Sequence, residues 1–97
     1  MATIRWTEES TMWMKDIYDY ISKDSISIAN KVIDDIYEKA QILQTMPEIG
    51  YKYQNRDDLR ILLYGHYRIA YLIKEDEVID ILGVFHGSLD IENYLKG

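Results

Sequence analysis

The chain has 97 residues, of which 47% are apolar and 29% charged, a size and composition typical of one globular domain. It contains no cysteine, which excludes a disulfide framework and any thiolate metal site. No stretch approaches the roughly 18 apolar residues of a membrane span, and no signal-peptide pattern opens the chain. We therefore expect a single domain over residues 1–97, in the cytoplasm and with no membrane partner.

The net charge of −6 is unevenly distributed along the chain. Residues 1–50 carry five basic against nine acidic side chains, residues 51–74 carry five against two, and residues 75–97 carry one against six. Sequence-independent binding to nucleic acid depends on phosphate neutralisation, so an acidic chain of this kind is not expected to bind DNA directly. A small basic site in the middle segment remains compatible with this charge.

The first fifty residues predict a strand and a helical hairpin. Residues 2–6 alternate as a half-buried strand does, and Thr7 is a candidate N-cap followed by acidic residues that favour a helix start. After a serine-rich connection over residues 22–27, apolar side chains recur at helical spacing from Ala29 to Leu43. Pro47 and Gly50 end this second helix, and the short connection predicts an antiparallel pair.

The next segments predict two antiparallel strands, over residues 59–63 and 67–74. The apolar rows of both strands face the helices only if the loop has three residues, Tyr64 to His66, which pairs Leu63 with Tyr67. A two-residue turn at Gly65 and His66 would pair Leu63 with Arg68 and send one row to the other face. The preferred register leaves one sheet face with the following residues: Arg60, Leu62, Arg68, Ala70 and Leu72.

An apolar run over residues 78–85 predicts a central strand, and Ser88 can cap a short last helix. The predicted fold class is therefore α+β. An N-terminal strand and a helical hairpin pack on an antiparallel-rich sheet, in the order β-α-α-β-β-β with a short C-terminal helix.

The two strand arginines are the first candidate site. In the preferred register Arg60 and Arg68 lie nearly opposite each other on the face away from the helices, where two guanidinium groups repel and a phosphate or carboxylate would fit between them. The alternative is that each arginine extends into solvent or pairs with a local acid, with the following candidates: Asp57, Asp58 and Asp80.

A second candidate is the segment from Tyr51 to Arg56, which interleaves aromatic and basic residues as binding surfaces for single strands or proteins do. We favour the simpler interpretation, in which these tyrosines cover the edge of the core with their hydroxyl groups in solvent.

The histidines, His66 and His86, offer imidazole groups, but we do not expect a metal site, because no cysteine or spaced carboxylate pair accompanies them. His86 follows a strand and precedes a helix, which suits acid-base chemistry, although a structural role is favoured. The sequence from His86 to Asp90 lacks the nucleophile-elbow context of a hydrolase. No glycine-rich nucleotide motif is present, so no cofactor is expected.

In order and spacing, these elements resemble the RelE/ParE superfamily of type II toxin-antitoxin toxins over nearly the whole chain. The resemblance is carried by the strand ending at Trp6-Thr7, the two-helix hairpin, Pro47-x-x-Gly50, Leu59-Arg60, Tyr67-Arg68-Ile69-x-Tyr71, and the strand ending at His86-Gly87. The long hairpin is more similar to the ParE, or plasmid-stabilisation, branch than to the compact ribonuclease branch.

The resemblance implies a growth-inhibiting toxin neutralised by a cognate antitoxin. RelE-like members cleave ribosome-bound mRNA, whereas ParE-like members poison DNA gyrase without chemistry of their own. Cleavage needs proton transfer and cations at the phosphorus, which would involve the following residues: Arg60, Arg68, His86 and Tyr94. The family usually has one or two arginines after the last strand, where this chain has Ser88 and Leu89. We therefore favour action on gyrase over mRNA cleavage, with a non-toxic partner-binding member as a third alternative.

Surface side chains near the strand arginines are candidates for binding the antitoxin or the target. Apolar groups beside cations suggest a groove for an amphipathic segment. The candidate binding residues are Tyr51, Lys52, Arg56, Leu62 and Leu72.

Overall fold

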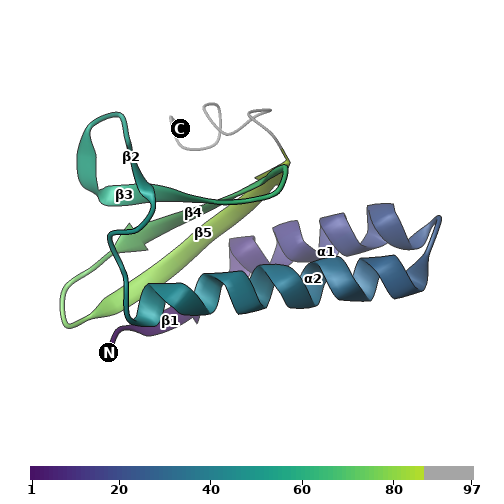
Figure 1. Cartoon of the computed structure of the whole chain (residues 1–97), viewed down its shortest axis with the longest axis horizontal. Helices are drawn as coiled ribbons and strands as arrows, with labels where there is room; N and C mark the ends of the chain where they lie inside the picture. Colours follow the sequence, from purple (N-terminus) through teal and green to yellow (C-terminus); the bar gives the residue numbers. More distant parts are fainter. Residues whose placement is uncertain (87–97) are drawn as a thin grey trace.

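The computed structural model describes residues 1–86, so the predicted last helix lies outside the described residues. A single five-stranded sheet has the order β1-β5-β4-β3-β2 (Figure 1). In chain order the elements are β1 (Thr3–Trp6), α1 (Glu8–Ser22), α2 (Ile26–Ala40), a 3-10 turn η1 (Gln41–Gln44), β2 (Tyr51–Tyr53), β3 (Arg56–Tyr64), β4 (Tyr67–Ile73) and β5 (Val78–His86). Only β1 pairs in parallel, with β5, while the other neighbours are antiparallel. The α+β class and the central position of β5 are confirmed.

Two side-chain caps begin the helices. The Thr7 hydroxyl accepts a hydrogen bond from the Ser10 amide and donates one to the Ile81 carbonyl, at 3.1 and 2.7 Å, so the same residue starts α1 and fastens it to β5. Ser25 caps α2 by accepting from the Ile28 amide at 3.1 Å. Such caps satisfy amide groups that have no partner within the helix. The helices form the predicted hairpin, whose connecting turn extends past the sheet in Figure 1.

The second helix is shorter than its apolar pattern predicts. The α-helical part ends at Ala40, and the last apolar position, Leu43, lies in the tighter turn η1. A 3-10 turn is a common end of an α-helix, and Leu43 is still fully buried. The chain then turns through Pro47 to enter the sheet.

The sheet buries side chains on both of its faces. On the helix face, Leu62, Ile69 and Val84 lie in one cluster with side chains from α1, α2 and η1. On the opposite face, which we call the far face, Ile61, Ala70 and Phe85 form a second cluster. Leu62, Ile69 and Val84 pair across the three strands β3, β4 and β5, and Ile61 and Ala70 form the next pair, whereas Phe85 pairs with Arg68. Side chains alternate between faces along a strand, which separates the two clusters.

The predicted pairing of β3 with β4 is wrong by one residue. The turn has two residues, with Gly65 at a φ of +57°, and it pairs Tyr64 with Tyr67 and Leu63 with Arg68. Because β3 carries apolar residues in both alternating rows, its pattern does not determine which row faces the helices. Glycine at the first turn position instead favours a tight two-residue hairpin. The side chains of β4 therefore lie on the faces that were predicted for them, whereas each side chain of β3 lies on the face opposite to the predicted one.

A strand that the sequence did not predict, β2, occupies the edge of the sheet. Residues 51–53 pair with β3, and the connecting residues Gln54 and Asn55 both have positive φ angles, 51° and 62°. Two consecutive positive φ angles are characteristic of a type I′ hairpin turn. The usual Asn-Gly or Asp-Gly signal for such a turn is missing here, which is why the segment resembled a loop.

A buried carboxylate joins the first and last strands. Asp80 Oδ1 accepts a hydrogen bond from Arg5 Nε at 2.8 Å, and Oδ2 accepts one from Arg5 Nη2 at 3.1 Å. Lys74 Nζ lies 3.4 Å from the same Oδ2. The hydrogen bond and charge of Arg5, aided by Lys74, hold the pKa of Asp80 below its usual range, although burial opposes them.

None of the helices formed by residues 1–86 is long and apolar enough to cross a membrane.

Acid is therefore expected to destabilise the fold through Asp80. A carboxyl group with a lowered pKa in the folded state adds stability above about pH 4, and this stability is lost as the pH falls through the lowered pKa. We predict that Asp80→Asn flattens the decline in unfolding free energy, measured by urea denaturation between pH 7 and pH 2.5. Asp57→Asn is the control, because Asp57 also forms an ion pair but its side chain is 82% exposed. An equal flattening in both variants would contradict the prediction.

Candidate functional site

Arg60 is a structural residue in this fold and does not share a face with Arg68. It pairs with Tyr71 on the helix face, whereas Arg68 pairs with Leu63 on the far face. The predicted juxtaposition of the two arginines is therefore wrong, as a consequence of the one-residue change in register. Arg60 is only 8% exposed, so its guanidinium group is withdrawn from any ligand at the surface.

The buried guanidinium of Arg60 binds main-chain carbonyls. Its Nη1 donates to the carbonyl oxygens of Glu48 and Gly50, at 3.1 and 2.9 Å, and its Nε donates to that of Asp57 at 2.8 Å. Buried carbonyl groups need such partners. Arg60 thereby holds the segment before β2 against β3.

Tyr71 completes this arrangement from the adjacent strand. Its hydroxyl donates to the Pro47 carbonyl at 2.7 Å and accepts from the Gly50 amide at 3.0 Å. Burial raises the pKa of Tyr71, which keeps the donating proton in place. We call residues 47–50 with Arg60 and Tyr71 the β2 clamp, because together they fix where β2 begins.

Arg68 is different, since it lies at the surface. Its Nη1 donates to the Tyr51 hydroxyl at 2.7 Å, and within residues 1–86 it forms no ion pair. Tyr51 and Leu63 beside it are 44% and 50% exposed, and register places both on the far face. We call these three residues the Tyr51–Arg68 surface.

The other predicted binding residues are less available. Lys52 lies 2.7 Å from Asp57, and Arg56 donates two hydrogen bonds to Asp58, at 3.0 and 2.8 Å. Leu62 was expected on the arginine face, but it is 5% exposed and belongs to the core on the helix face. Leu72 lies on the far face, as predicted, and is half-buried. Of the four basic residues singled out from the sequence, Arg68 alone is neither buried nor joined to an acidic partner among residues 1–86.

The groups proposed for RNA cleavage do not gather on one described surface. His86 pairs with Tyr67, whose side chain packs against the core on the helix face. His86 therefore lies on the helix face, whereas Arg68 lies on the far face. Arg60 is buried in the β2 clamp, and Tyr94 lies outside the described residues. The described members of this set thus offer no arrangement in which a base, an acid and two cations converge on one phosphate.

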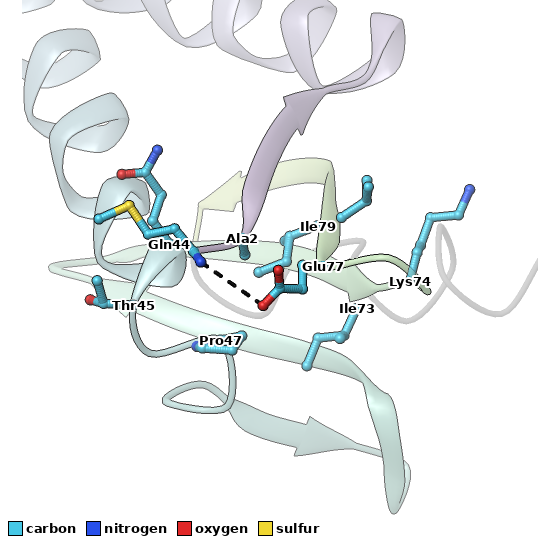
Figure 2. Close-up of a pocket in the computed structure, with 10 residues that line it drawn as sticks. Ala2, Gln44, Thr45, Pro47, Ile73, Lys74, Glu77 and Ile79 are labelled. Carbon is cyan, nitrogen blue, oxygen red and sulfur yellow. Dashed lines mark ion pairs between the residues drawn. The ribbon is translucent and has the colours of Figure 1, made fainter.

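A cavity of about 530 Å³ opens at the other end of the sheet. Figure 2 shows apolar side chains such as Ala2, Ile73 and Ile79 in its lining, with Lys74 and Glu77 also present. The Glu77 carboxylate lies 3.9 Å from the N-terminal ammonium group, the ion pair dashed in Figure 2. None of the residues predicted from the sequence to be functional lines this cavity, so the Tyr51–Arg68 surface is the candidate functional site.

This surface is suited to binding rather than to covalent chemistry. An exposed tyrosine and leucine offer apolar contact area, and an arginine held by a hydrogen bond offers a fixed cation. Aromatic residues and arginine are the side chains most often responsible for affinity in protein interfaces. An acidic or phosphorylated group on a partner would complement Arg68.

Comparison with known proteins links this fold to toxin-antitoxin systems. Residues 4–91 match the family described as the ParE toxin of the type II toxin-antitoxin system parDE. The chromosomal ParDE toxin-antitoxin system of Pseudomonas aeruginosa has a similar structure, with a TM-score of 0.75 and 22% identity, over 91% of this chain and 98% of that one. The toxin-antitoxin complex RelBE2 of Mycobacterium tuberculosis gives a TM-score of 0.67 at 19% identity, over 88% and 96%. No curated protein matches the chain.

Proposed function

Because the chain belongs to the ParE toxin family of type II toxin-antitoxin systems, we propose that it inhibits growth by binding DNA gyrase, without cutting RNA. The observation that carries this proposal is the separation of the two strand arginines. Arg60 is buried in the β2 clamp, whereas Arg68 is only half-buried and lies beside the exposed side chains of Tyr51 and Leu63. One cation with apolar neighbours suits recognition of a protein surface.

A cognate antitoxin is the proposed partner that keeps the toxin inactive. Both structural neighbours are described as toxin-antitoxin systems or complexes, which supports a partner of this kind here. The Tyr51–Arg68 surface would accept an amphipathic segment with an acidic residue placed near Arg68. Leu72 remains a candidate contact on the same face, whereas burial of Leu62 argues against it.

Supercoiling by purified gyrase tests the proposed function. The wild-type chain should inhibit the reaction, and Arg68→Ala should require at least about ten times more protein for equal inhibition, the effect of losing one interface residue worth roughly 1.4 kcal/mol. Lys23→Ala is the control, because Lys23 is likewise a cation without an ion pair among residues 1–86, but it is exposed in the turn between the helices, away from Arg68.

Three experimental outcomes would contradict the proposed function or favour one of its alternatives. Full supercoiling activity at a large molar excess of wild-type chain would contradict gyrase binding. Cleavage of translated mRNA, detected by primer extension and abolished in Arg68→Ala, would establish the RelE-like alternative. A chain that does neither and leaves growth unchanged would be a non-toxic partner-binding member of the family.

A further inference from the structure

The fold brings together the only two histidines of the chain. His66 lies in the turn between β3 and β4, and His86 is the last residue of β5, yet their ring centres are 6.1 Å apart. This proximity depends on the two-residue turn and on the pairing of Tyr67 with His86. Both histidines are exposed, so solvent and ions can reach the space between them.

Both imidazole rings are available as ligands. Within the described chain neither ring takes part in a hydrogen bond or an ion pair, and their recorded contacts are with aromatic rings. The Tyr67 ring lies 5.3 Å from that of His86 in an edge-to-face arrangement, which restricts the rotamers of His86 by packing. One of the two rings is thus partly oriented before any ligand binds.

The separation of the rings suits a shared metal ion. Imidazole nitrogen binds Zn²⁺ at about 2.0–2.1 Å, so two rings on one ion have centres on the order of 5–6 Å apart. The observed 6.1 Å lies at the upper end of this range, so the spacing of the rings allows one ion to bind a nitrogen atom of each. Imidazole favours Zn²⁺, Ni²⁺ and Cu²⁺ over the hard cations that prefer oxygen ligands.

We propose that His66 and His86 together bind one divalent transition-metal ion, with water as the remaining ligands. Such an ion would tie the β3–β4 turn to the end of β5. Residues 1–86 contain no group of three or more metal-ligating side chains, so this two-ligand site should be open and its affinity modest. A ligand that binds only the folded state raises the unfolding temperature.

Metal titration of the chain prepared without a polyhistidine tag tests this site. With Ni²⁺ or Zn²⁺ at pH 8, calorimetry should detect one ion per chain, and NMR should show both imidazole rings responding together. The unfolding temperature should rise by at least about 4 °C at saturation, whereas Mg²⁺ should have no effect.

The single variants His66→Gln and His86→Gln separate a shared site from two independent ones. Each should weaken binding at least tenfold and remove the rise in unfolding temperature, while unfolding without metal stays unchanged because both side chains are exposed. The proposal would be overturned if the wild-type chain bound no metal ion. It would also be overturned if each variant bound the ion through its remaining histidine as tightly as the wild-type chain does. The result is independent of whether the chain binds gyrase.

Discussion

Replacing Arg60 with alanine is expected to lower the free energy of unfolding by about 2–4 kcal/mol, measured by urea denaturation. The change removes the donor to the buried carbonyl group of Gly50 and to the partly buried carbonyl groups of Glu48 and Asp57, and unsatisfied buried acceptors are costly. For a domain whose total stability is about 5–15 kcal/mol, this is a large fraction. Arg60→Lys should recover less than half of the loss, because one ammonium group cannot reproduce the geometry of the guanidinium.

Arg56→Ala is the matched control for Arg60. Arg56 lies on the same strand and pairs with Asp58, but the side chains of this pair are 52% and 48% exposed. Exposed ion pairs contribute about 0–1 kcal/mol. If Arg60→Ala were as mild as Arg56→Ala, the β2 clamp would not be a significant source of stability, and a role for Arg60 at the surface would have to be reconsidered.

Replacing Gly50 with alanine is expected to cost about 2–3 kcal/mol of unfolding free energy, because the site is overpacked and the clamp must open. A Cβ atom at this position would lie 2.7 Å from the Ile61 carbonyl oxygen and 2.7 Å from the Tyr71 hydroxyl. The first neighbour is sheet backbone and cannot move away cheaply. The second is the hydroxyl that binds the segment from Pro47 to Gly50.

Gly65→Ala provides the comparison for Gly50. A Cβ atom at Gly65 would meet nothing within 4 Å, so the cost there comes only from its φ of +57°, about 1–2 kcal/mol. The Gly50 variant should therefore be the less stable of the two in the same urea experiment. The reverse order would show that the close approach at Gly50 is relieved by a shift of the clamp.

Most of the helices and strands could be predicted from local signals in the sequence. Thr7 and Pro47 mark the beginning and end of the helical hairpin through capping and backbone restriction, and both effects operate within a few residues. The run over residues 78–85 is apolar on both faces, as expected of a central strand. What could not be predicted was the register of β3, because its two rows are both apolar and a one-residue shift exchanges them.

The register of β3 also decides which residues share a face with Arg68. Arg60 and Arg68 are both basic residues on adjacent strands, and the sequence contains no signal that one is buried on carbonyl groups. The clamp depends on main-chain atoms of residues 48, 50 and 57, whose positions follow from the path of the chain and not from residue type. The hydrogen bond between Arg68 and Tyr51 likewise depends on β2, which was expected to be a loop.

Separating the two arginines changes how loss-of-function variants should be interpreted. Loss of toxicity in an Arg60 variant would follow from unfolding and would reveal nothing about catalysis. Loss of toxicity in Arg68→Ala, with unchanged stability, would instead identify a contact with the target. Variants of these residues should therefore be compared only after their unfolding free energies are known.

Action on gyrase is tested by a DNA-damage (SOS) reporter, read after induction of the chain without its antitoxin in a bacterial host. Poisoned gyrase leaves DNA damage, so we expect a rise in the reporter together with growth arrest, both reduced in Arg68→Ala and retained in Lys23→Ala. Growth arrest with a flat reporter would contradict action on gyrase.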